Sequence, residues 1–404
     1  MKFTKLTMIF LYLLGFLFGD ELAVLESFQI KDGKSFTNMY QGFECQVDDG
    51  GAFWVLYSLT RDNEWPQYLI DCYKPGRNLP VKDLGAYYGK GGWYDPVVCR
   101  ISGTTLEAQV FVSNDYGRKM QYHELTSLSY SQESSNQIQY PGGVSKTSLS
   151  HIRKINDTTA SAYSLEWSET GDPLSVKFLK DFKLYSLWPD DYSGPFLEAE
   201  TLWESETPAT FVYDERVNGT NVMAALYRHW EDDNWRFVCV DNERVLFETE
   251  AALSASMLNV SLKAGEKGFF ICWQEKQNSD IFYKEYTLVS NKLSLRNKLF
   301  SVDDQGLQGT SAYELSISSE RVFLQFPILS KKGNSSPANW KSMVRYTVRL
   351  SDQALIKTDT IISFPGPRDF VSHRITTQAG VPHSLIITND GLRSQLLYFG
   401  SINF

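Results

Sequence analysis

Three short segments of the chain combine carboxylates with aromatic side chains in a way that suits recognition of a sugar. They are residues 188–192, 229–235 and 364–370. Aromatic faces stack on sugar rings, while carboxylates accept hydrogen bonds from hydroxyl groups or serve as the acid and nucleophile of a glycosidase. Solvated turns with an aromatic anchor have the same composition. The residues that we expect to contact a ligand are Trp188, Asp190, Asp191, Trp230, Asp232, Asp233 and Arg368.

Hydrolysis of a glycosidic bond would need two carboxylates about 5 to 9 Å apart, one of them with a raised pKa. Asp190, Asp191, Asp232 and Asp233 are the first candidates for such a pair. The same carboxylates offer oxygen ligands for calcium, but they do not form a D-x-D-x-D-G loop. The zinc motif H-E-x-x-H, the nucleophile elbow G-x-S-x-G and the phosphate-binding glycine loops are also missing. We therefore assign no catalytic residue, no cofactor and no metal.

The N-terminus has the composition of a secretory signal peptide. Lys2 and Lys5 give a positive start, residues 7–18 are almost all apolar, and Gly19 offers a small residue for cleavage. An uncleaved signal anchor is the alternative. No later segment reaches the roughly 18 apolar residues of a membrane span, so we expect a secreted, extracellular protein with residues 1–19 removed. Acceptor motifs for N-glycosylation occur at Asn156, Asn218, Asn259 and Asn334.

The cysteines suit an oxidising compartment, in which two disulfides and one odd thiol are expected. Cys239 and Cys272 fall in two neighbouring apolar strands, so we expect these two to pair. Three further cysteines lie close together near the N-terminus and could hold a second bridge. They are Cys45, Cys72 and Cys99.

The net charge of −9 restricts the choice of partner. Nucleic acids and anionic membranes are bound through a basic face, so we expect neither. The ligand classes that remain are an extracellular glycan and another extracellular protein.

A strand–turn–strand pattern recurs along the chain. An apolar or alternating run meets a polar turn rich in Asp, Asn, Gly or Ser, and a second run with aromatic or β-branched residues follows. The repeat spacing is about 54 residues, and each unit has room for two flanking strands, which is typical of a β-propeller of four-stranded blades. The seven hairpins begin near Phe53, Ala108, Ala162, Val222, Phe269, Val322 and Ser384.

The 10 Trp, 22 Tyr and 25 Phe suit cross-strand packing in an all-β fold of about seven blades. Residues 20–404 would form a single domain, and residues 22–30 would add a strand that closes the last blade. Residues 248–257 and 313–320 are short helical candidates that fit connections. Tandem β-sandwich domains are the alternative, because they also have short strands with frequent turns.

The turn Ser113-Asn114-Asp115-Tyr116-Gly117 resembles the Asp-box of sialidase-like propellers. In that family Ser and Asp bond the turn backbone, Gly takes a positive φ, and a final aromatic residue plugs the next strand. Met120 stands at the aromatic position, which departs from the pattern. The resemblance implies a structural turn for Ser113, Asp115 and Gly117. It would imply three arginines, a Tyr–Glu pair and an acidic Asp for catalysis, but the sequence does not identify the arginines.

These patterns favour a secreted glycoprotein that acts as an extracellular binding module. A propeller glycosidase with a carboxylate pair is the alternative, and a structural or matrix protein is a third possibility. A carboxylate pair in a central pocket would favour the glycosidase, whereas scattered carboxylates would favour the binding module.

Overall fold

A computed structural model gives the arrangement of the chain. The backbone is described for residues 23–29, 44–47, 53–59, 67–73, 82–83, 94–102, 105–114, 117–126, 132–139, 146–154, 159–167, 173–183, 200–206, 208–217, 221–229, 234–241, 243–253, 257–275, 280–305, 307, 313–318, 320–329, 340–378, 380–389 and 394–401. Side chains are described for Trp54 and, with gaps, from residue 177 onward.

Antiparallel strands make up almost all of this described chain, so the prediction of an all-β protein is confirmed. The only helix among the described residues is a 3-10 turn at Asp303–Gln305. The first three sheets have four strands each and follow chain order. They contain β2 (Glu44–Val47), β3 (Phe53–Leu59), β4 (Gln67–Tyr73) and β5 (Lys82–Asp83); β6 (Tyr94–Ser102), β7 (Thr105–Asn114), β8 (Gly117–Thr126) and β9 (Gln132–Gln139); and β10 (Lys146–Lys154), β11 (Thr159–Trp167), β12 (Pro173–Lys183) and β13 (Glu200–Glu206).

Two further sheets repeat this order, and the last sheet is larger, with seven strands in the order β1-β28-β27-β26-β25-β24-β23. The fourth sheet contains β14 (Pro208–Val217), β15 (Asn221–His229), β16 (Arg236–Asp241) and β17 (Val245–Glu250). The fifth contains β18 (Met257–Ala264), β19 (Gly268–Glu275), β20 (Ile281–Thr287), β21 (Lys292–Leu293) and β22 (Asn297–Phe300). The sixth contains β23 (Glu314–Ile317), β24 (Arg321–Leu329), β25 (Trp340–Arg349), β26 (Leu355–Gln378), β27 (Val381–Asn389), β28 (Ser394–Ser401) and β1 (Ala23–Gln29).

The predicted hairpins are confirmed. Each lies on two neighbouring antiparallel strands, and in the first five sheets these are the second and third strands. The pairs are β3 with β4, β7 with β8, β11 with β12, β15 with β16, β19 with β20, β24 with β25, and β27 with β28. The helical candidate 313–320 is wrong, because its middle forms β23, whose residues Leu315 and Ile317 are buried against the preceding, fifth sheet. The candidate 248–257 is also wrong, because its described residues end β17, begin β18 or lie outside any helix.

β26 is 24 residues long and belongs to two groups of strands. Its first part pairs with β25, and residues 369–378 pair with β27. The pairing with β25 shifts register where Pro365, Gly366 and Pro367 occur. Proline has no backbone N–H to give to a ladder, so this segment allows the strand to leave one partner and reach the other.

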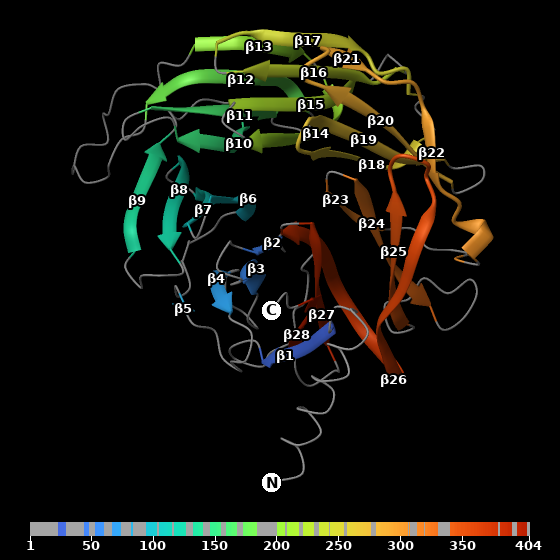
Figure 1. Ribbon diagram of the computed structural model, residues 1–404. Coiled ribbons are helices and arrows are strands. Elements are labelled where there is room, and N and C mark those ends of the chain that lie inside the picture. Colours follow the sequence, from blue (N-terminus) through green and yellow to red (C-terminus); the bar gives the residue numbers. More distant parts are fainter. Residues whose placement is uncertain are drawn as a thin grey trace.

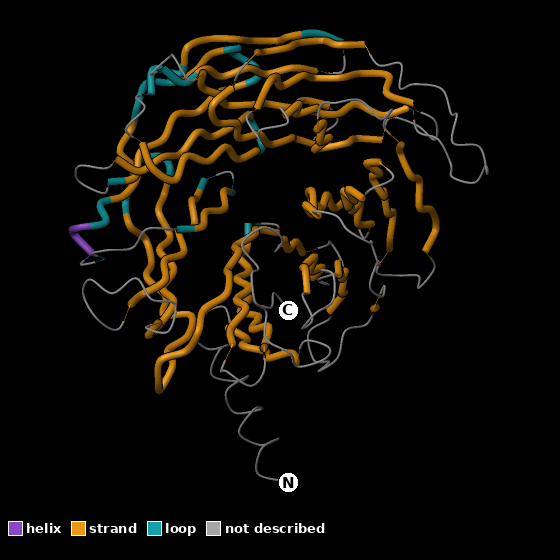
Figure 2. The backbone as a smooth tube through the Cα atoms, turned by 180° about the vertical axis from the view of Figure 1, so that it is seen from behind, coloured by secondary structure: helices purple, strands orange, loops and turns teal. Residues whose placement is uncertain are grey.

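The sheets succeed one another in chain order around the molecule (Figure 1). First strands of successive sheets lie against each other: β2 contacts β6, β6 contacts β10, β14 contacts β18, and β18 contacts β23. β2 also contacts β26, so the first sheet adjoins the last. The terminal strands β1 and β28 are paired, with Ala23 opposite Ser401. Seen from behind, strands make up most of the described backbone (Figure 2).

Side chains of the later sheets are buried on both faces, which explains the unbroken apolar run of β19. Successive side chains of a strand point to opposite faces. Phe269, Ile271 and Trp273 accordingly pack toward the β14–β17 sheet, whereas Phe270 and Cys272 pack toward the β23–β25 strands. A strand covered on both sides by other sheets has no solvent face that would call for polar residues.

The expected disulfide between Cys239 and Cys272 is wrong, since both are buried free thiols. Cys239 lies in the cluster between the fourth and fifth sheets. Cys272 points to the other face of the fifth sheet, into the next cluster. The strands are neighbours, as the sequence suggested, but strand alternation directs the second sulfur away from the first. Burial raises the pKa of each thiol to about 12.

Candidate functional site

Most side chains that the sequence singled out as ligand contacts lie outside the described residues. Arg368 lies in β26, with its backbone opposite Trp340. At the Asp-box-like turn, Ser113 and Gly117 belong to the paired strands β7 and β8. Asn259 is exposed at the start of β18, with φ of 49°. The residues outside the description are Trp188, Asp190, Asp191, Trp230, Asp232 and Asp233, the turn residue Asp115, and the sequon residues Asn156, Asn218 and Asn334.

A group of cationic and aromatic side chains lies directly beside the predicted segment 229–235. It is formed where the fourth and fifth sheets face each other, at the ends of strands β15 and β19 and the starts of β16 and β20. We call it the cationic cluster. Its members are Arg228, Trp235, Trp273, Phe282, Lys284 and Arg296.

Strand alternation places these residues on facing surfaces. Arg228 has the same parity along β15 as Leu226, which packs against the fifth sheet. Trp235, from the segment before β16, belongs to the same buried cluster. On the opposing sheet Trp273 and Phe282 are cross-strand partners, and Lys284 follows Phe282 on the same face. The six residues therefore come together through packing, although Arg228 and Arg296 are far apart in the chain.

The cluster is held by direct contacts. The Arg228 guanidinium lies 5.8 Å from the centre of the Trp235 ring, and the Arg296 guanidinium lies 3.8 Å from that of Phe282. Trp273 and Phe282 are stacked with centroids 6.0 Å apart. Cation–π contacts of this kind stabilise by about 0.5 to 2 kcal/mol each.

Backbone groups connect the two sides of the cluster. The Lys284 ammonium donates to the carbonyl of Ala251 at 2.7 Å. The Ala251 N–H in turn donates to the carbonyl of Trp235 at 2.7 Å. Lys284 of the fifth sheet is thus tied to the segment that leads from β17 toward β18. These two hydrogen bonds connect Lys284, Ala251 and Trp235 across the two sheets.

Among the described residues of the cluster, positive charge exceeds negative charge. Arg296 forms an ion pair with Glu275 at 2.8 Å, and nearby Lys298 forms one with Asp280 at 2.7 Å. Lys284 has no carboxylate partner among the described residues, and it is only 8 % exposed. Burial, with a smaller contribution from Arg296, lowers the pKa of Lys284. The environment therefore disfavours the charged amine unless a negative group approaches it.

Several buried donors at the cluster have no acceptor among the described residues. They are the indole Nε1 of Trp235, the indole Nε1 of Trp273 and Nε of Arg228. Trp235 is 4 % exposed and Trp273 is fully buried. Buried donors without a partner cost about 1 to 3 kcal/mol each, so they are uncommon in a native protein.

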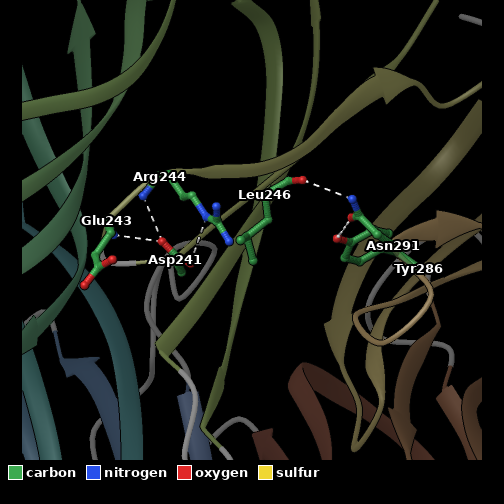
Figure 3. Close-up of polar contacts among 6 residues, drawn as sticks. All are labelled: Asp241, Glu243, Arg244, Leu246, Tyr286 and Asn291. Carbon is green, nitrogen blue, oxygen red and sulfur yellow. Dashed lines mark hydrogen bonds and ion pairs between the residues drawn. The ribbon is translucent and has the colours of Figure 1, made fainter.

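Further hydrogen bonds lie in the fourth and fifth sheets at the end away from the cluster (Figure 3). Asp241 accepts hydrogen bonds from the backbone N–H groups of Glu243 and Arg244, both at 2.8 Å, and closes the turn between β16 and β17. The Tyr286 hydroxyl donates to Asn291 at 2.6 Å, and the Asn291 amide donates to the carbonyl of Leu246 at 3.2 Å. These bonds tie the β20–β21 turn to β17 of the neighbouring sheet (Figure 3).

A tyrosine–glutamate pair lies between the third and fourth sheets. The Tyr227 hydroxyl donates to Glu248 at 2.7 Å, and Trp203 Nε1 donates to the same carboxylate oxygen at 3.2 Å. Burial, followed by the hydrogen bond to Glu248, raises the pKa of Tyr227 well above its ordinary value. The ring of Tyr227 packs edge-on against Trp203 and His229. A phenol that holds its proton this firmly is poorly suited to nucleophilic attack.

A second polar region links β23–β25 to the strands beyond the bend of β26. Arg374 donates to Glu314 at 2.6 Å, joining β26 to the neighbouring first strand β23. Deeper in the interface the Gln325 amide lies 2.9 Å from His373 Nδ1. Arg345 donates to the Pro382 carbonyl at 3.3 Å and approaches Asp359 at 3.5 Å. We call this group the polar seam.

Both histidines of this interface are buried. Burial, and to a smaller extent Arg374, lowers the pKa of His373 to about 3. Burial, and then Arg345, lowers the pKa of His383 to about 4. The two imidazoles are therefore neutral at physiological pH and act as hydrogen-bonding groups of the sheet interface.

Four carboxylates of the described chain are held in ion pairs. Glu314, Asp359, Glu275 and Asp280 are each bonded to a lysine or arginine. Over the same residues, no group of three His, Cys, Asp or Glu side chains is placed to hold a metal ion. No helix in the described part of the chain has the length and apolarity of a membrane span.

The cluster lies beside the segment 229–235, but its cations Arg228, Lys284 and Arg296 were not among the contacts predicted from the sequence. A signal was present: Lys284 interrupts an apolar strand, IFYKEYT, in which every residue up to Lys284 is buried. A charged residue in such a run is rarely buried without a reason.

No protein-family model and no curated protein matches the chain. Solved structures of Trypanosoma rangeli sialidase are similar to it in fold. The sialidase in complex with the inhibitor DANA is 9% identical, with 93% of this chain and 60% of that chain covered and a TM-score of 0.41. The complex with 2,3-difluorosialic acid is 8% identical, with 94% and 59% covered and a TM-score of 0.44. The chain thus spans about three fifths of the length of these sialidases.

Proposed function

We propose that this chain is a secreted, glycosylated β-propeller that acts as an extracellular binding module. Seven groups of antiparallel strands support the propeller: the first five sheets, of which the fifth has an additional strand, then β23–β26, and finally the end of β26 with β27, β28 and β1. The contact of β2 with both β6 and β26 supports a closed ring. Secretion rests on the apolar N-terminal segment, and the exposure of Asn259 supports its glycosylation.

The observation that carries the binding function is the cationic cluster. It gathers fixed charges and hydrogen-bond donors at the ends of strands, where a rigid scaffold commonly supports a ligand site. Four of the described carboxylates, by contrast, sit in ion pairs with cations: Glu275, Asp280, Glu314 and Asp359. This arrangement favours recognition of a ligand over chemical conversion of one.

A glycan-array screen of the purified, secreted protein tests this function. We expect specific binding that falls at least tenfold in Arg228→Ala and is retained in Arg349→Ala. Arg349 is the matched control because it is an exposed arginine that pairs with Asp352 at 2.9 Å in the turn after β25. The pair Asp190→Ala and Asp232→Ala tests the segments that the sequence singled out. Absence of any binding would contradict the glycan ligand and leave a protein partner as the ligand class.

A propeller glycosidase is the second candidate, favoured by the Tyr227–Glu248 hydrogen bond. Release of sugar from fluorogenic glycosides, abolished by Tyr227→Phe or Glu248→Gln, would support it. We expect no release, because the raised pKa of Tyr227 opposes formation of a phenolate. Turnover that survives both substitutions would point instead to Asp190, Asp191, Asp232 and Asp233.

A further inference from the structure

We propose that the cationic cluster binds an oxyanion, a sulfate or carboxylate group carried by the ligand. The inference rests on the proposed binding function and names the chemical class of the ligand. It starts from an excess of donors. Lys284 has three N–H donors but one acceptor in the structure, the Ala251 carbonyl. The indoles of Trp235 and Trp273 are buried and have no acceptor among the described side chains and backbone groups.

Charge points to the same ligand class. The chain as a whole has a net charge of −9, yet Arg228, Lys284 and Arg296 gather at one end of a single interface. Among the described residues there, only Arg296 has a carboxylate partner, Glu275. Buried cations are normally paired, because an unpaired charge in a region of low polarity is strongly unfavourable. An anion at the cluster would offset the charge of Lys284 and Arg228 together.

Hydrogen-bond chemistry separates an oxyanion from other ligands. A sulfate or carboxylate presents only acceptors, whereas a neutral hydroxyl also brings a donor. The groups on offer are all donors: an ammonium, a guanidinium and two indole N–H groups. Hydrogen bonds between such donors and an ionised acceptor are about twice as strong as neutral ones. A metal cation would meet no ligand atom on these side chains.

The position of the cluster suits an anionic group that is attached to a larger molecule. Arg296 has a half-exposed side chain and Arg228 is partly exposed, while Lys284 and the two indoles lie deeper. The group would therefore reach the buried donors past two arginines at the surface. Arginine suits this place, because its planar fork matches the two oxygens of a carboxylate or sulfate.

Isothermal titration calorimetry of the full secreted chain, with inorganic sulfate and with sodium glucuronate at constant ionic strength, tests the proposal. Sodium chloride is the reference salt. We expect saturable binding of at least one oxyanion that weakens at least tenfold in Arg228→Gln and in Lys284→Met, and is unchanged in Arg349→Gln. Thermal unfolding of each variant verifies that it is folded, and Arg228→Gln at a partly exposed position remains informative if Lys284→Met does not fold.

The two arms also separate the sources of the group. Stronger binding of sulfate favours a sulfated ligand, and stronger binding of glucuronate favours a uronic acid. No saturable heat with either salt, or equal affinity in folded Arg228→Gln, would overturn the proposal. Binding of neutral glycans on the array without any oxyanion effect would overturn this inference while leaving the binding function in place. Oxyanion binding without any array signal would support the oxyanion site and contradict glycan binding.

Discussion

At the scale of single residues, the chain places ionisable groups in unusual surroundings with different consequences. Lys284 and the two histidines of the polar seam are buried in polar contacts. Cys239 and Cys272 are buried among aromatic and aliphatic side chains. Lys284 and the histidines need polar partners in the protein interior. The two thiols, whose pKa values are raised, have low reactivity. Burial alone therefore does not mark a functional residue; the donors and acceptors around it do.

The two thiols should resist alkylation in the folded protein. Their pKa of about 12 leaves almost no thiolate at pH 8, and both are nearly inaccessible. We expect iodoacetamide to label the Cys239 and Cys272 peptides only after unfolding in denaturant. Mass spectrometry of the digested protein reads this out. A disulfide-linked peptide containing both cysteines would contradict the arrangement of their strands.

At the scale of elements, close approach of strands restricts side chains at particular positions. A Cβ at Gly268, the first residue of β19, would lie 1.8 Å from the backbone oxygen of Tyr286 on β20. That oxygen belongs to the ladder and cannot move without breaking it. Gly380, between β26 and β27, is different: its φ is 79° and nothing lies within 4 Å of an added Cβ.

Gly268→Ala should therefore reduce the free energy of unfolding by about 3 kcal/mol, an effect at the upper end of overpacking costs. Gly380→Ala should cost about 1 to 2 kcal/mol through its positive φ alone. Urea unfolding followed by tryptophan fluorescence compares the two variants. Equal stabilities of Gly268→Ala and the parent protein would show that β19 and β20 are further apart than described.

The polar seam predicts loss of stability in mild acid. His373 and His383 have folded pKa values of about 3 and 4, below the ordinary 6.5. The unfolded chain therefore binds more protons between pH 6.5 and these values, so stability rises with pH in that window and falls on acidification. At pH 5 the loss is about 2 kcal/mol for each histidine.

Urea unfolding at pH 7.5 and pH 5.0 measures this loss. The double variant His373→Gln and His383→Asn should have a smaller difference between the two pH values than the parent protein. His229→Gln, at a partly exposed position in β15, is the matched control and should retain the full difference. A pH difference that is identical in the parent and in the double variant would assign the acid sensitivity to other groups.

At the scale of the whole molecule, the first and last described strands depend on each other. β1 contributes the final strand of the seven-stranded sheet through pairing of Ala23–Gln29 with residues of β28. Without it β28 would become an edge strand with unpaired N–H and C=O groups. Such edges favour association with other chains.

Deletion of residues 23–29 should consequently lower the melting temperature and cause self-association, whereas deletion of residues 20–22 alone should do neither. Circular dichroism and size-exclusion chromatography with light scattering measure both effects. A deletion variant that stays monomeric with an unchanged melting temperature would mean that β1 adds nothing to the sheet.

The sequence by itself determined the all-β class and the hairpins. Turn residues and apolar alternation are local signals. The hairpins beginning near Phe53, Val222 and Phe269 could therefore be predicted from the sequence alone. The same signals identified the segment 229–235, beside which the cationic cluster lies. The short helical pattern at 313–320 failed, because burial between two sheets overrode a weak local preference.

Only the tertiary structure decided which faces meet. Cys239 and Cys272 lie on neighbouring sheets, yet one sulfur points toward the other strand and one points away, because side chains alternate along β19. Arg228 lies in β15, Lys284 in β20 and Arg296 in the segment between β21 and β22, and no spacing along the chain relates them. They meet because two sheets pack face to face with their strand ends aligned, and that alignment is a property of long-range packing rather than of local sequence.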